Sequence, residues 1–110
     1  MAIEKWSERV TVARLTDDPQ LTDDLETIEE SLAHTTMDVV LDFASVQYIN
    51  SSNLARLLKL RKQLLAKEAQ LVLCNVHDQV WGAFLVTGID KLFVLSDNVT
   101  TALATVQMTR

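Results

Sequence analysis

Two adjacent serines, Ser51 and Ser52, are the residues of this sequence best placed to do chemistry. They precede Leu54, Leu57 and Leu58, whose spacing is that of an amphipathic helix, so both hydroxyls are expected at its start. The first turn of a helix offers backbone N–H groups without intrahelical partners and the positive end of the helix dipole, which together stabilise a phosphate. Either serine is therefore a physically sensible phosphorylation site, and plain N-capping is the alternative.

Other reactive side chains are few and lack partners in the sequence. Cys74 lies in an apolar run and is expected to be buried, while His77 follows that run at the same sheet edge as Ser51. One cysteine and two histidines do not make a disulfide or a metal site. The only glycines, Gly82 and Gly88, are too few for a phosphate-binding loop, which leaves little support for a small nucleotide-binding protein. The sequence predicts no enzymatic activity, no cofactor and no metal.

Length and charge narrow the class of protein. The 110 residues fit one domain over 1–110, and the net charge of −5 has the wrong sign for binding nucleic acid. No apolar run approaches the length of a bilayer, and the first residues do not read as a signal peptide. We expect a cytoplasmic protein that does not insert into membranes.

Apolar runs with strand character alternate with helical patterns along the chain. Strands are expected at 9–16, 39–43, 71–74 and 92–95, and helices at about 22–34, 51–65, 78–86 and 98–106. A turn is expected at Asp17, Asp18 and Pro19, with Thr22 as the N-cap of the first helix. This alternation predicts parallel βαβ units with right-handed crossovers, and hence an α/β domain.

Charges are segregated along the sequence. Nine acids and no base lie between Leu15 and Ala55, and the next twelve residues hold five bases and no acid: Arg56, Lys59, Arg61, Lys62 and Lys67. These blocks are either solvated helix faces or a surface that orients a charged partner.

The segment VVLDFASVQYINSSNLARLLKLRKQL, at 39–64, resembles the signature of the STAS domain family, which includes the anti-sigma factor antagonists. The resemblance extends to RLT at 14–16, to QLVLCNVHDQVWGAFLVTGIDKLFVL at 70–95 and to DNVTTAL at 97–103, in family-like order and spacing. It implies a single STAS domain with a four- to five-stranded, mostly parallel (mixed) sheet and about four helices.

The resemblance places the family's phosphorylated serine on Ser51, with Ser52 as second choice. Asn50 stands where phosphorylated members have Asp, and Asn53 stands where they have Gly. Asparagine keeps the hydrogen-bonding capacity of aspartate but not its charge. The loop at 17–20, DDPQ, replaces a Gly-Glu-Leu-Asp segment that contributes to partner docking in the family.

The function implied by the resemblance is a bacterial partner switch in transcription regulation. The unphosphorylated protein would bind an anti-sigma factor with a histidine-kinase-like ATPase fold, which as a serine kinase would phosphorylate Ser51, and a serine phosphatase would reset the cycle. The expected partner-binding residues are Asn50, Ser51, Ser52, Asn53, Arg56 and Lys59. The alternative, favoured by Asn50 and Asn53, is a phosphorylation-independent scaffold subunit of a signalling or lipid-transport complex.

Overall fold

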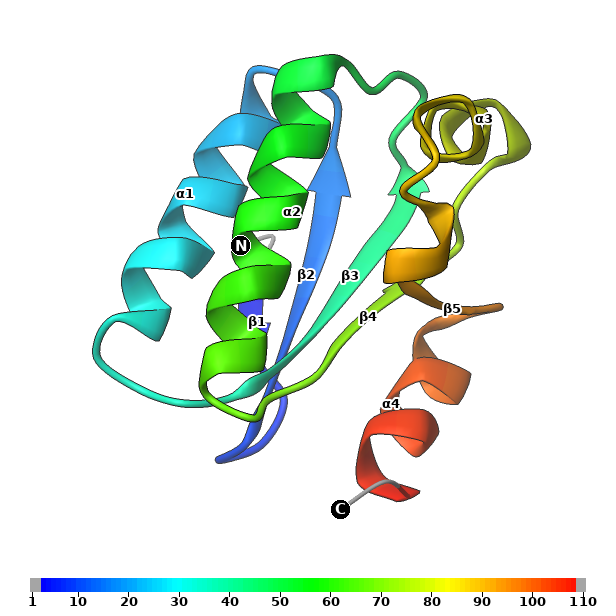
Figure 1. The fold of residues 1–110 in the computed structure, drawn as a ribbon. Helices are drawn as coiled ribbons and strands as arrows, with labels where there is room; N and C mark the ends of the chain where they lie inside the picture. Colours follow the sequence, from blue (N-terminus) through cyan, green and yellow to red (C-terminus); the bar gives the residue numbers. More distant parts are fainter. Residues whose placement is uncertain (1–2, 109–110) are drawn as a thin grey trace.

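A five-stranded sheet with helices on both faces makes up residues 3–108, which are the residues that the computed structural model describes (Figure 1). The strands are β1 (Ile3–Lys5), β2 (Val10–Thr16), β3 (Asp38–Ser45), β4 (Leu71–Cys74) and β5 (Val94–Ser96). They lie in the order β1-β2-β3-β4-β5, with β1 antiparallel to β2 and every other pair parallel. The predicted α/β class and the mixed, mostly parallel sheet are confirmed.

Residues 3–108 also form four α-helices and one short 3₁₀ helix, of which α4 follows the last strand. They are α1 (Gln20–Leu32), α2 (Ser51–Ala66), α3 (Asp78–Thr87), η1 (Asp90–Leu92) and α4 (Val99–Met108). Helices α1 and α2 run side by side over one face of the sheet, and α4 covers part of the other face (Figure 1). Among residues 3–108, no helix is both long and apolar enough to cross a bilayer.

The central strands carry core residues on both faces, which explains their continuous apolar runs. On β3, Val39, Leu41 and Phe43 pack toward α1 and α2, whereas Val40 packs in the smaller core beneath α4. Cys74 of β4 belongs to this smaller core and is fully buried. Burial, reinforced by the nearby Asp42 carboxylate, raises the pKa of the Cys74 thiol to about 12.

The start of α1 differs from the sequence-based expectation. The helix begins at Gln20 rather than after Thr22, and the prediction of Thr22 as its N-cap is wrong. Pro19 occupies the cap position without a side-chain hydrogen bond, and the Asp18 carboxylate accepts from the Thr22 backbone N–H at 2.8 Å instead. A carboxylate just before Pro19 therefore takes over the role that the Thr22 hydroxyl was expected to play.

Candidate functional site

Ser51 and Ser52 are the first two residues of α2, just beyond the loop that leaves the carboxyl end of β3. The helix boundary expected from the sequence is thus confirmed. Both residues are exposed, and within residues 3–108 neither hydroxyl makes a hydrogen bond. Both hydroxyls are therefore open to solvent.

Asn50 and Asn53, not the serines, cap the helix. The Asn53 backbone N–H donates to Asn50 Oδ1 at 2.8 Å, and the Asn50 backbone N–H donates to Asn53 Oδ1 at 3.0 Å. This reciprocal arrangement is a capping box built from two asparagines. The alternative in which Ser51 is only a helix cap is therefore wrong, since Asn50 performs that role.

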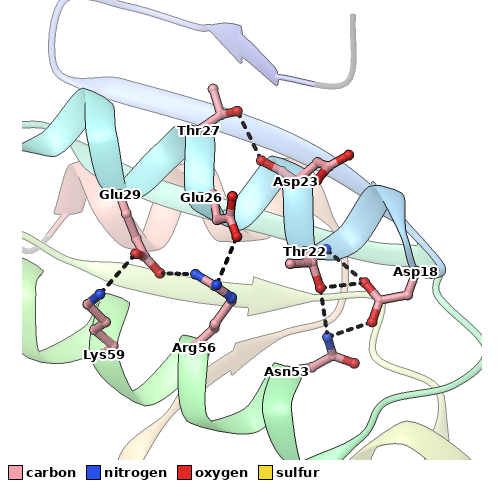
Figure 2. A network of polar contacts seen from close by, with 9 residues as sticks. All are labelled: Asp18, Thr22, Asp23, Glu26, Thr27, Glu29, Asn53, Arg56 and Lys59. Carbon is pink, nitrogen blue, oxygen red and sulfur yellow. Dashed lines mark hydrogen bonds and ion pairs between the residues drawn. The ribbon is translucent and has the colours of Figure 1, made fainter.

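The Asn53 amide also ties α2 to the loop before α1. Asn53 is only 2% exposed, and its Nδ2 donates to Asp18 Oδ2 at 2.9 Å and lies 3.5 Å from Thr22 Oγ1 (Figure 2). The Thr22 hydroxyl donates to Asp18 Oδ1 at 2.7 Å. These hydrogen bonds, with that from Asn53 the largest cause, hold the pKa of the Asp18 carboxyl below its usual 3.8. We call Asp18, Thr22, Asn50 and Asn53 the amide cluster.

A second aspartate fastens the same loop to the segment before the serines. Asp17 Oδ1 accepts from the backbone N–H groups of Gln47 at 2.8 Å and Tyr48 at 3.1 Å. The two loops that leave β2 and β3 are therefore held together by neighbouring carboxylates. Tyr48 remains 70% exposed beside this junction, so the edge of the site presents an aromatic ring to solvent.

Arg56 and Lys59 face α1 rather than standing apart as a free basic patch. Arg56 Nη2 lies 2.8 Å from Glu26 Oε1 and its Nη1 lies 3.5 Å from Glu29 Oε1. Lys59 Nζ lies 3.5 Å from Glu29 Oε2 (Figure 2). We call these four residues the ion-pair cluster. The structure brings Asn50, Ser51, Ser52 and Asn53 together at the start of α2, whereas Arg56 and Lys59 extend from them along the contact between α1 and α2.

The sequence-based reasoning singled out the loop at 17–20 but missed the side chains that lock it. Asp17, Asp18 and Thr22 all contact the segment around the serines. A signal for them is present in the sequence, because two aspartates at the end of a parallel strand lie at the same sheet edge as the β3–α2 loop. Their hydrogen-bond partners are about thirty residues away, however, and pattern alone does not identify them.

The remaining candidate, His77, lies at the predicted sheet edge. Its Nε2 is 2.7 Å from the carbonyl oxygen of Ala44 near the end of β3, which gives the ring a structural contact. In the described part of the chain, no three His, Cys, Asp or Glu side chains gather in a way that could hold a metal ion.

A comparison with known protein families finds one match to this chain. The family model for the STAS domain matches residues 3–102, which is most of the chain. No curated protein matches the chain significantly in sequence.

Solved structures with the same fold come from several proteins. An anti-sigma-factor antagonist (STAS) domain protein from Planctomyces limnophilus is 18% identical with a TM-score of 0.81, over 96% of this chain and 97% of that one. The phosphorylated form of the Bacillus cell fate determinant SpoIIAA is 17% identical with a TM-score of 0.74, over 94% and 96%. A sulfate transporter family protein from Wolinella succinogenes is 18% identical with a TM-score of 0.76, over 90% and 85%. At these identities the likeness shows a shared fold.

Proposed function

The chain belongs to the STAS domain family, and on that premise we propose that it is a non-enzymatic regulator whose binding to an anti-sigma factor is controlled by phosphorylation of Ser51. The partner would be a serine kinase with a histidine-kinase-like ATPase fold, and a serine phosphatase would reverse the modification. The observation that carries the proposal is the pair of exposed hydroxyls at the start of α2, left free because Asn50 caps the helix.

The geometry of the capping box suits this role. Asn50 and Asn53 satisfy each other's backbone N–H groups, so the fold does not require the Ser51 hydroxyl. In the proposed step, Ser51 Oγ attacks the γ-phosphorus of ATP, its proton passes to a base on the kinase, and ADP leaves. The phosphate then lies at the positive end of the α2 dipole, where a negative charge is stabilised.

The same phosphate would weaken partner binding. It adds about 1.5 to 2 negative charges to an exposed surface at pH 7. The first two basic side chains along α2, Arg56 and Lys59, already pair with Glu26 and Glu29 of α1. A phosphorylated Ser51 would therefore enter an interface in which neither Arg56 nor Lys59 is free to pair with it. The cost of desolvating the phosphate would then favour dissociation of the partner.

The test is intact-mass analysis after incubation with Mg-ATP and each kinase-like anti-sigma factor of the same genome. We expect one added phosphate on the wild type and on Ser52→Ala, and none on Ser51→Ala. Ser51→Ala should fold with a stability within about 0.5 kcal/mol of wild type, because Asn50 and not Ser51 supplies the cap. Kinases that modify their other substrates but leave this protein unmodified would contradict the proposal.

The second candidate is a STAS scaffold subunit of a signalling or lipid-transport complex, bound without phosphorylation. The observation that favours it is Asn53, whose buried amide fills the family's glycine position and anchors the start of α2 to Asp18. A fixed helix start suits a constitutive interface. A complex that persists with the charged variant Ser51→Asp, at unchanged affinity, would support the scaffold and oppose the switch.

A further inference from the structure

Tyr48 has the most exposed aromatic side chain of the described residues, and it lies three residues before Ser51. Its exposed fraction is 70%, whereas that of Trp6, the next most exposed aromatic residue, is 48%. Over the described range 3–108, the Tyr48 ring packs on no other ring and its hydroxyl makes no hydrogen bond. The fold therefore makes little use of this side chain.

The segment that carries Tyr48 is nevertheless fixed along its whole length. Val46 is fully buried, and Ile49 packs against the larger core. Asp17 Oδ1 accepts from two backbone N–H groups of the segment, one of them that of Tyr48 itself at 3.1 Å, and Asn50 belongs to the capping box. A backbone that is already ordered loses little conformational freedom when a partner contacts its exposed side chain.

The chemistry of tyrosine suits a contact of this kind. Tyrosine is enriched among the residues that carry most of the binding energy at protein interfaces, because its ring offers a large apolar area with few rotatable bonds. Most of the Tyr48 ring is still in contact with water, so most of that area remains to be buried. The matching feature of a partner is an apolar pocket beside the surface that receives Ser51.

We infer that Tyr48 is the anchor through which this protein binds the anti-sigma factor, with its ring inserted into an apolar pocket of that partner. Asp17 is the positioning residue that holds the segment in place. The inference rests on the proposed function, from which it takes the partner. It also deepens the regulation, because a pocket that closes around Tyr48 excludes water next to Ser51. A phosphate on Ser51 must then be desolvated for the anchor to enter.

Isothermal titration calorimetry with a kinase-like anti-sigma factor tests the anchor, with Mg-ADP in place of Mg-ATP so that no phosphate is transferred. Tyr48→Ala should raise the dissociation constant about 30-fold, whereas Tyr48→Phe, which retains the ring, should stay within about threefold of the wild type. The matched control is Trp6→Ala, an exposed aromatic residue between β1 and β2 at the opposite end of the sheet. It should bind like the wild type, and the thermal unfolding midpoint of Tyr48→Ala should not move.

Steady-state phosphorylation separates binding from the chemical step. Tyr48→Ala should raise KM and leave kcat unchanged, since Ser51 keeps its place at the start of α2. For the positioning role, Asp17→Ala should raise the dissociation constant about tenfold. Asp17→Asn should recover most of the lost affinity, because its amide oxygen can accept from the same two N–H groups.

The outcomes distinguish this inference from the function on which it rests. A wild type that no kinase-like anti-sigma factor binds or modifies would overturn both. A wild type that is bound, with Tyr48→Ala no weaker than Trp6→Ala, would overturn the anchor alone, as would a fall in kcat at unchanged KM. An Asp17→Asn variant as weak as Asp17→Ala would overturn the positioning role of Asp17.

Discussion

The contact between α1 and α2 holds two polar clusters built from different chemistry. At the end near the serines, the amide cluster joins one carboxylate, Asp18, to neutral donors, and its central residue Asn53 is 2% exposed. Further along, the ion-pair cluster joins full charges, and the Arg56 and Lys59 side chains are 30% and 70% exposed. Hydrogen bonds that involve the buried Asn53 amide and a single charged group fix geometry and depend little on salt, whereas exposed ion pairs are adjustable and screened. The serine site is thus held by the more rigid of the two.

Asn53→Leu should have the largest effect on stability. The change keeps the approximate volume but removes the donor to Asp18 and the acceptor for the Asn50 N–H. Because Asp18 and Asn50 are exposed and water can replace the lost partner, each of the two hydrogen bonds is worth about 0.5–1.5 kcal/mol, and denaturant unfolding should show a total loss of about 1–3 kcal/mol. Asn53→Asp tests the hydrogen bond to Asp18 more specifically than Asn53→Leu, because it keeps the acceptor for the Asn50 N–H but places a second carboxylate beside Asp18. Its deficit should shrink as the pH falls and one of the two carboxyls becomes protonated.

Arg56→Met should have the next largest effect, of about 1 kcal/mol, at the upper end for a partly exposed ion pair. The Glu29 side chain is 12% exposed and its Oε1 makes no hydrogen bond, so removal of Arg56 leaves it with Lys59 alone. Lys62→Met, on an exposed lysine of the same helix, is the matched control and should be neutral. Unlike the deficit of Asn53→Leu, that of Arg56→Met should fall in high salt. Equal salt dependence for the two variants would remove the distinction between the clusters.

Acid should weaken the amide cluster through Asp18. Because the pKa of Asp18 is lower in the folded protein than its usual 3.8, its ionised form adds stability that is fully present above about pH 4. That stability is lost as the pH falls below 3.8 toward the lowered value. The effect should be smaller than that of Arg56→Met, since the Asp18 residue is exposed. Unfolding curves of wild type and Asp18→Asn should converge as the pH falls through this range, and a constant gap would contradict the assignment.

Lys59→Met should have the smallest effect, a few tenths of a kcal/mol, because its Nζ lies 3.5 Å from Glu29 and its side chain is largely exposed. The Lys59→Met variant is more informative about partner binding than about stability. If an anti-sigma factor docks on this face, Lys59→Met should lower the association rate more than the stability, as measured by stopped-flow kinetics at low salt. An unchanged rate would place Lys59 outside the docking surface.

Local patterns predicted most of the fold. The apolar run at 71–74 coincides with β4, and the predicted helix start at Ser51 coincides with that of α2. The edge strand β1 was missed, because Ile3, Glu4 and Lys5 have neither an apolar run nor a length that signals a strand. Thr22 is a favourable N-cap residue followed by two acids, but the N-cap of α1 is Pro19, three residues earlier.

The candidate site was predicted less completely than the fold. The serines and the two asparagines follow from the local sequence, since they sit at a helix boundary. The partners of Asn53, Arg56 and Lys59 on α1 and the loop before it do not, because they lie about 27 to 35 residues away. From the sequence alone, the basic residues of α2 are therefore predicted to form an unpaired surface. In the fold, two of them, Arg56 and Lys59, pair with acids of the adjacent helix α1.

The burial of Cys74 gives the protein an internal reporter of its own opening. The chain has a single thiol, and in the folded state it is fully covered and its pKa is near 12, so a thiol reagent at neutral pH meets almost no reactive thiolate. Labelling must await a fluctuation that separates α4 from the sheet or unfolds the whole domain. The labelling rate, followed in the variants above without any engineered probe, then measures how often that opening occurs in each.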